Sequence, residues 1–165
     1  MNYKIRIVKP NEVRSALNLA LAVFMEFEAP VYSEDGIKRF IDDCIENEEY
    51  ANTYISSKYF MMGAFGFDEN TECDKIIGMI AAKGDNHISM VFVNKNYHRQ
   101  GVATAIMKEI ITTLRLKGAD KITVNSSPYG LPFYHVFGFT DTDTEQTKNG
   151  LTFTPMVFEL KDYIS

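Results

Sequence analysis

The sequence predicts an α+β fold with a mixed central sheet. Short segments with alternating apolar residues are typical of half-buried strands, and longer segments with apolar residues three or four positions apart are typical of amphipathic helices. These segments follow one another in the order β-α-α-β-β-β-α-β-α-β-β. The length of 165 residues suits one core, so we expect a single domain over residues 1–165.

The first half of the chain contains one strand, two helices and then three strands. Residues 3–8 alternate as a strand, and Asn11 is the expected N-cap of a helix that ends near Pro30. A second helix begins at Ser33, with acidic residues in its first turn, where the helix dipole favours them. Three strands are then expected, over residues 59–67, 75–82 and 87–93.

The second half alternates helices and strands. Apolar residues at helical spacing run from Ala103 to Leu114, and Gly118 is the expected end of that helix. A strand and a short helix follow, over residues 121–125 and 131–137. Asn149-Gly150 is typical of a two-residue hairpin turn. The strand after it contains Pro155, which predicts a bulge or an edge position there.

Composition excludes several classes of function. With 45% hydrophobic and 24% charged residues, the chain has the balance of an ordinary globular protein. The formal net charge of −5, without a cluster of Lys and Arg, argues against nucleic-acid binding. Cys44 and Cys73 are far apart, and neither they nor the histidines have metal-ligand spacing. We therefore expect two free thiols and no metal.

The sequence also shows no membrane or export signal. The N-terminus lacks the apolar core of a signal peptide. The longest apolar segment, Ala16 to Met25, is interrupted by Asn18 and is too short to span a bilayer. These features predict a cytoplasmic protein without a membrane partner.

The most informative segment is residues 91–104, where a strand leads into a glycine turn and a long helix. The first N–H groups of a helix have no partner inside it, and with the helix dipole they form a site for phosphate. Gly101 lets a ligand approach the backbone, and the small Ala103 keeps the wall of such a site low. An ordinary strand-to-helix turn shows the same glycine, so the neighbouring residues decide between the two interpretations.

Those neighbours resemble the acyl-CoA signature of the GNAT superfamily of N-acyltransferases. Arg99-Gln100-Gly101-Val102-Ala103, after Val91-Phe92-Val93, is similar to the family pattern (Gln/Arg)-x-x-Gly-x-(Gly/Ala) that follows a strand. His98 stands where the family usually has Gln or Arg. Downstream, Phe133 to Phe139 resembles the family's Phe-Tyr-x-x-x-Gly-Phe segment. The resemblance covers nearly the whole chain and implies a GNAT-like, mostly antiparallel sheet with helices on both faces.

The resemblance implies a donor site for acetyl-CoA. The open backbone of one strand would pair with the pantetheine arm, through Val91, Phe92 and Val93. Backbone N–H groups of the next loop would hold the pyrophosphate, through Arg99, Gln100, Gly101, Val102, Ala103 and Thr104. Arg99 and His98 would add charge. The family also commonly contacts CoA with an Asn ahead of its tyrosine; the usual spacing reaches Ser127, with Asn125 close by, and both are candidates.

Tyr134 is the candidate general acid. In the family a tyrosine at this place protonates the departing CoA sulfur, and a phenol with a pKa of about 10 carries a proton at neutral pH. A tyrosine in a packed segment beside Phe133 is also a common core residue. The catalytic interpretation therefore depends on the matched motif.

The sequence leaves the general base open. Some family members use a Glu on the fifth strand, where Ile122 stands here. Glu26 and Glu28, at the end of the first helix, are candidates, although we expect carboxylates at a helix end to be solvated. A water chain is an alternative, and so are two histidines, His87 and His135.

These residues predict an N-acetyltransferase that moves an acetyl group directly from acetyl-CoA to a primary amine in a ternary complex. The absence of a Cys or Ser nucleophile motif argues against an acyl-enzyme. The acceptor stays open between a small amine, an amino sugar, a polyamine and a protein amine. The alternative is a non-catalytic acyl-CoA-binding or regulatory module. A homodimer is expected only by analogy with the superfamily.

Overall fold

The computed structural model describes residues 2–70, 72–161 and 163, so five residues of the expected domain lie outside the described part. The strands are β1 (Tyr3–Ile7), β2 (Phe60–Asp68), β3 (Cys73–Lys83), β4 (His87–Val93), β5 (Lys121–Ser126), β6 (Thr140–Asp141), β7 (Gln146–Lys148) and β8 (Leu151–Glu159). The α-helices are α1 (Val13–Phe27), α2 (Glu34–Phe40), α3 (Glu48–Ile55), α4 (Val102–Leu116) and α5 (Leu131–Phe137). A π-helical turn, Ile41–Ile45, continues α2.

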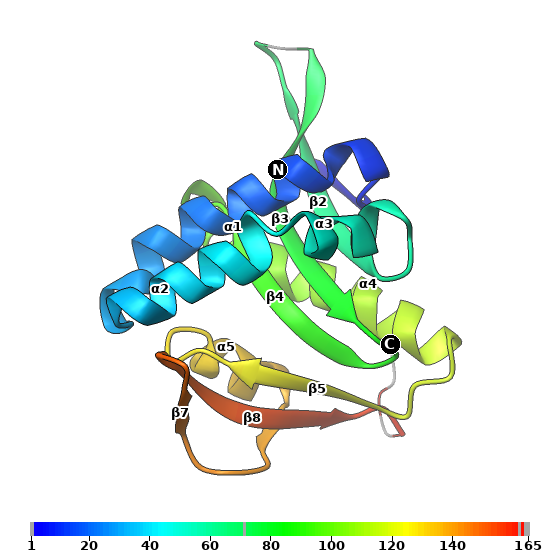
Figure 1. Cartoon of the computed structure of the whole chain (residues 1–165). Helices are drawn as coiled ribbons and strands as arrows, with labels where there is room; N and C mark the ends of the chain where they lie inside the picture. Colours follow the sequence, from blue (N-terminus) through cyan, green and yellow to red (C-terminus); the bar gives the residue numbers. More distant parts are fainter. Residues whose placement is uncertain (1, 71, 162, 164–165) are drawn as a thin grey trace.

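One eight-stranded sheet organises the molecule. Its order is β1-β2-β3-β4-β5-β8-β6, with β7 paired to β8, and all pairs are antiparallel except β4 with β5. Figure 1 shows α1, α2 and α3 in front of the β1–β4 half, and α4 and α5 behind the sheet. The predicted mixed, mostly antiparallel sheet with helices on both faces is confirmed. Within the described residues, no helix is long and apolar enough to cross a membrane.

Two apolar clusters occupy the two faces of the sheet. Behind it, α4 buries Ile106 and Ile110 against the sheet, and Tyr134 of α5 joins the same cluster. In front, α1 buries Leu17 and Phe24 against the other face. The helical spacing of these residues produces the two buried faces.

Two helix starts differ from the prediction. Asn11 is not an N-cap: it lies in a 3-10 turn (Pro10–Glu12), where the Glu12 carboxylate accepts a 2.8 Å hydrogen bond from Lys9 N. The helix α3 was not predicted, because it is short and its first residues are acidic. Asn47 caps α3 by accepting from Tyr50 N at 3.0 Å, and the acidic residues occupy the first turn, where the dipole favours them. By contrast, Ser33 caps α2 as expected, accepting from Gly36 N.

The C-terminal hairpin is confirmed, and its proline takes one of the two positions that the sequence predicted. Asn149 and Gly150 both have positive φ, 54° and 78°, as a tight hairpin turn between β7 and β8 requires. The register of β5 with β8 runs without a shift through Pro155, which lies opposite Asn125. The bulge is therefore absent, whereas the edge position is present: on the other side of β8, the pairs with β6 and with β7 both leave out Pro155. The Pro155 carbonyl accepts from Thr142 N, just beyond the two-residue strand β6, which is too short for periodicity to predict.

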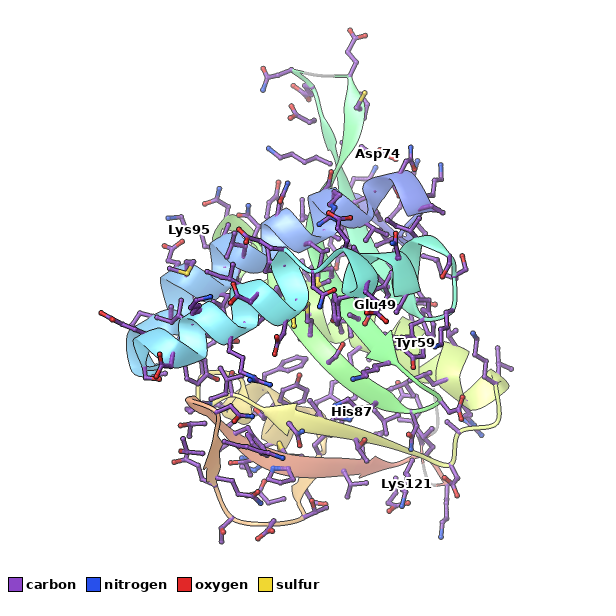
Figure 2. All side chains as sticks on the ribbon, in the orientation of Figure 1. Glu49, Tyr59, Asp74, His87, Lys95 and Lys121 are labelled. Atoms are coloured by element: carbon purple, nitrogen blue, oxygen red, sulfur yellow. The ribbon has the colours of Figure 1, made fainter. Side chains whose placement is uncertain are left out.

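The central irregularity is the separation of β4 from β5. The two strands run parallel but pair only His87 with Thr123 and Ile88 with Val124. The next residue, Ser89, is a bulge, because Ile88 lies opposite Ala82 while Met90 lies opposite Ala81 on β3. From there the strands spread apart, as Figure 1 shows, with His87 and Lys121 marking their shared beginning in Figure 2. The β5-facing backbone of residues 89–93 consequently has no strand partner among the described residues.

The helix α2 contacts the β7–β8 hairpin over this opening. The hydroxyl of Tyr32 donates to the Thr152 carbonyl at 3.2 Å. Gly36 is buried against the hairpin turn, where a Cβ would overlap the Gly150 carbonyl oxygen. This close approach links the two segments that border the front side of the gap.

We predict that Gly36→Ala destabilises the protein by more than about 1 kcal/mol, although alanine normally favours a helix by that amount over glycine. The added methyl group meets backbone and must displace the hairpin. Gly66→Ala is the matched control, because a Cβ there meets Ile77 at an ordinary 3.5 Å. Urea denaturation of both variants checks this, and equal stabilities would contradict the contact.

Candidate active site

The N-terminus of α4 forms an open backbone cradle. Among the described residues, no side chain caps this helix, so its first N–H groups are available. Its N-cap is Gly101, with φ of 78°, and a Cβ there would have no heavy atom within 4 Å. Arg99 also has a positive φ of 57°, an unusual conformation for a non-glycine residue. The turn therefore presents main-chain donors to open space.

The strand before this cradle presents main chain rather than side chains to the gap. The side chains of Val91 and Val93 pack on the α4 side of the sheet, and Phe92 is buried on the α1 side. The backbone edge is left facing the space that β5 has vacated. The structure thus brings together the predicted donor strand and the predicted donor loop, 91–93 and 99–104, at one end of β4.

A shallow hollow of about 290 Å³ adjoins the cradle on the α5 side. Apolar and aromatic side chains line most of it, with one amine and one hydroxyl from α4: Thr104, Lys108, Phe133, Val136, Phe137, Phe158 and Tyr163. The aromatic side chains suit stacking of a flat ring, and the Lys108 amine suits an anionic substituent on such a ring.

His98 is used inside the protein. Its Nε2 lies 2.6 Å from the Val93 carbonyl oxygen, and its ring centroid lies 4.9 Å from that of Phe27. The sequence suggested that His98 would add charge to the phosphate site. The structure instead shows this ring joining the end of β4 to the end of α1.

A carboxylate and two tyrosines gather where α1 ends. Glu28 is half-buried, and burial raises its pKa to about 7, while a hydrogen bond from the Ser127 hydroxyl acts in the opposite direction. Burial raises the pKa of Tyr134 far above that of an exposed phenol, and the nearby Glu28 charge adds to this. The pKa of Tyr32 is raised by the same two causes, with burial the larger. Glu28 therefore ionises near neutrality, while both phenols keep their protons.

The other base candidates are engaged elsewhere. Glu26 is exposed and pairs with Lys95 at 2.9 Å; Lys95 is labelled beside α1 in Figure 2. His87 Nδ1 lies 2.9 Å from the Thr123 hydroxyl, and His135 pairs with Asp141. The expectation of a solvated carboxylate holds for Glu26 and is wrong for Glu28. The one local signal in the sequence is that Glu28 stands between the aromatic Phe27 and the small Ala29, followed by Pro30.

The two candidates near the end of β5 differ in their surroundings. Asn125 lies on β5 and is exposed, whereas Ser127 directly follows the strand. Ser127 is half-buried beside Glu28, and its hydroxyl also accepts from Gly130 N at 3.1 Å, which shapes the turn into α5. Ser127 therefore belongs to the group around Glu28 and Tyr134.

A cluster of hydroxyl groups was missed by the sequence reasoning. The Tyr54 hydroxyl lies 3.3 Å from the Tyr50 hydroxyl and 3.3 Å from that of Ser89, at the β4 bulge. Tyr50 and Tyr54 both come from α3, the helix that was not predicted. The cluster places neutral hydrogen-bonding groups on the front side of the gap.

Metal ligation finds no support in the described part of the chain. No group of three His, Cys, Asp or Glu side chains there could hold an ion. Cys44 is half-buried, and burial raises the pKa of its thiol to about 11.

Comparisons with known proteins agree with this geometry. A curated relative, the uncharacterized N-acetyltransferase YafP of Escherichia coli K12, is 31% identical over 78 residues, which are 47% of this chain and 49% of that protein. The match thus spans about half the length of that relative. Among solved structures, a GCN5-related N-acetyltransferase from Rhodopseudomonas palustris is 20% identical, with a TM-score of 0.79 over 97% of both chains. The PaiA N-acetyltransferase of Thermoplasma acidophilum, in complex with coenzyme A, is 18% identical, with a TM-score of 0.77 over 96% of this chain and 99% of that one.

These solved structures are similar in fold. The sequence itself matches a family model, described as an acetyltransferase (GNAT) domain, over residues 28–160. That range contains the donor strand, the cradle, Glu28 and Tyr134. The chain belongs to the GNAT acetyltransferase family.

Proposed function

We propose that this protein transfers an acetyl group from acetyl-CoA directly to a primary amine. The observation that carries the proposal is the pairing of a half-buried Glu28, ionising near neutrality, with a buried, protonated Tyr134. Acyl transfer to an amine needs one group that takes a proton and one that gives a proton. The structure of PaiA with coenzyme A, which shares the fold, supports the choice of donor.

The donor fits the open strand and the cradle. The pantetheine arm would lie along the unpaired β4 edge, hydrogen bonding to the main chain of residues 91–93 as an added strand would. The pyrophosphate would bind the N–H groups of residues 99–104 at the α4 N-terminus. The hollow beside Thr104 and Lys108 would take the adenosine end. The pantetheine arm, the pyrophosphate and the adenosine end of one ligand would thus bind the β4 edge, the cradle and the hollow, which adjoin one another.

Proton transfers follow from the two pKa values. Glu28 accepts a proton from the acceptor ammonium, which frees the nitrogen lone pair to attack the thioester carbonyl carbon. The new C–N bond forms as the C–S bond breaks, and the sulfur leaves with the bonding electrons. Tyr134 gives its proton to that sulfur, and the phenolate regains a proton from the second N–H that the attacking nitrogen loses as the amide forms. The products are an amide, a free thiol and the proton held by Glu28, which passes to solvent. Ser127, bonded to the charged form of Glu28, steadies the carboxylate between these steps.

A non-catalytic acyl-CoA-binding module was the alternative, and its basis was the lack of a recognisable base. Glu28 supplies one, so the enzyme is favoured. The whole of residues 1–165 is proposed as the catalytic domain, because β1 and β8 both belong to the central sheet.

The donor site is tested by titrating acetyl-CoA into the protein in a calorimeter. We expect binding of micromolar order, with ATP giving no heat. Gly101→Ala should weaken binding by about tenfold, or about 1.4 kcal/mol, because its Cβ projects into the ligand space. Gly84→Ala is the matched control, since that glycine also has a positive φ and open surroundings but lies in the β3–β4 turn. Equal binding by both variants would remove the cradle from the site.

We predict that Tyr134→Phe lowers kcat by about a hundredfold, the usual effect of removing a general acid. The dissociation constant for acetyl-CoA should stay within about twofold, because the ring and its packing remain. The assay follows thiol release with an acceptor first identified from a panel of amines. An unchanged kcat would show that Tyr134 is only a core residue.

Glu28 should set the pH dependence of the rate. Its carboxylate fraction rises from about one tenth at pH 6 to about nine tenths at pH 8, given the pKa of about 7. The rate should rise over this range, and Glu28→Gln should lower kcat by about a hundredfold and remove this step. Comparing both proteins with one acceptor separates Glu28 from ionisation of the acceptor itself.

The pH dependence of the folding stability tests the raised pKa of Glu28 without an acceptor substrate. Between the ordinary pKa of 4.5 and about 7, the native state keeps a proton that the unfolded chain releases. The contribution of this residue to stability therefore falls as the pH rises through that window. Glu28→Gln should remove that part of the decline in urea denaturation. An identical pH dependence in both proteins would mean that Glu28 ionises normally.

A further inference from the structure

Three aromatic rings from three separate segments lie in a row at the wide end of the gap. The His98 ring, from the turn before the cradle, lies 4.9 Å from Phe27 between ring centroids, with 46° between the planes. The other neighbour of Phe27 is Tyr129, from the β5–α5 turn, at 5.3 Å and 30°. We call His98, Phe27 and Tyr129 the three-ring bridge. It joins the segments that follow β4 and β5 across the end of α1.

The residues that flank the bridge are those of the proposed reaction. Phe27 directly precedes Glu28, and Tyr129 follows Ser127 by two positions. His98 is bonded through Nε2 to the carbonyl of Val93, the last residue of the donor strand. Each ring is therefore attached, by one or two residues or by one hydrogen bond, to a group that binds the donor or moves a proton.

The end of α1 is tied to the donor side a second time. Glu26 pairs with Lys95, which lies between the donor strand and His98. Such an exposed pair contributes at most about 1 kcal/mol, and ring contacts of this kind contribute about 0.5–1.5 kcal/mol each. The ring contacts are therefore the stronger of the two links. They also extend to Tyr129, in the turn after β5, whereas the Glu26–Lys95 pair does not.

Ordinary core packing does not account for Tyr129. Its side chain is 49% exposed, yet its ring stacks on Phe27. His98 occupies the position where Gln or Arg is usual in the resembling motif, and neither of those would place an imidazole ring against Phe27. Burial therefore does not explain the ring of Tyr129, and the family motif does not explain the ring of His98.

We propose that the three-ring bridge is a positioning device for acetyl transfer. It couples the conformation of the donor loop to the positions of Glu28 and Ser127. Binding of the donor at the His98 end therefore affects the placement of the proton-transfer groups at the Tyr129 end. The proposal rests on the proposed function. His98, Phe27 and Tyr129 act through other residues and touch no reacting atom.

A double-mutant cycle on acetyl-CoA binding tests the coupling. His98→Gln keeps a donor for the Val93 carbonyl but loses the ring, and Tyr129→Leu removes the ring at the other end. We expect each to weaken binding about threefold and the double variant to weaken it by much less than the ninefold product, since residues with a shared partner are not additive. In a Phe27→Leu background, the two effects should multiply.

Matched variants separate the bridge from general loss of aromatic surface. Tyr129→Phe keeps the ring and should restore the coupling, and Phe67→Leu removes a ring that is 63% exposed on β2, far from the gap. The rate–pH profile supplies an independent readout: Tyr129→Leu should lower the apparent pKa assigned to Glu28, because water gains access. His98→Asn replaces His98→Gln if the latter does not fold.

Two outcomes are distinguishable. Normal binding of acetyl-CoA by the unmodified protein, with multiplying effects in both backgrounds, overturns the bridge and leaves the proposed function intact. Failure of the unmodified protein to bind acetyl-CoA overturns the proposed function and the bridge together.

Discussion

The loss of pairing between β4 and β5 is the constraint on which the site depends. Two parallel strands that begin in register would normally continue to pair, but the Ser89 bulge turns β4 after Ile88. The bulge interrupts the regular pairing of β4, and among the described residues the β5-facing edge of residues 89–93 is left without a strand partner, while the other edge pairs with β3. An open strand edge inside a folded domain needs a partner, and an extended ligand with amide groups provides one. The same divergence brings the ends of α1 and α5 into the gap.

The end of α1 carries the carboxylate of the proposed reaction. Phe27, the last residue of α1, contacts the His98 and Tyr129 rings, and the next residue, Glu28, is half-buried, in contrast to the exposed Glu26. The helix end, the donor loop and the β5–α5 turn are thus fixed relative to one another by side chains rather than by the sheet, which has separated at this point. The hairpin contact of Gly36 closes the front side by backbone packing.

The sequence predicted those parts of the molecule that local patterns determine. Strand alternation, helical spacing, Asn149-Gly150 and the glycine turn at Gly101 all act within a few residues, and the structure agrees with each. The helix α3 was missed because its first turn is acidic and has few apolar residues, so the capping residue Asn47 was its only local signal. The burial of Glu28 could not be predicted for a different reason: it depends on Ser127 and Tyr134, about a hundred residues away. The residues next to a charged side chain at a helix end do not indicate whether distant segments of the chain will bury it.

The same buried environment underlies both proton transfers of the proposed reaction. Removing water raises the pKa of any acid that ionises to an anion, so the same burial acts on Glu28 and on Tyr134 in the same direction. The starting values differ, and the consequences differ with them. A carboxyl raised to about 7 is still ionised enough to accept a proton at neutral pH, whereas a phenol raised from 10 is always protonated. The negative charge on Glu28 further disfavours ionisation of Tyr134, which keeps the two roles apart. In the proposed reaction, burial therefore separates the role of base, at Glu28, from the role of acid, at Tyr134.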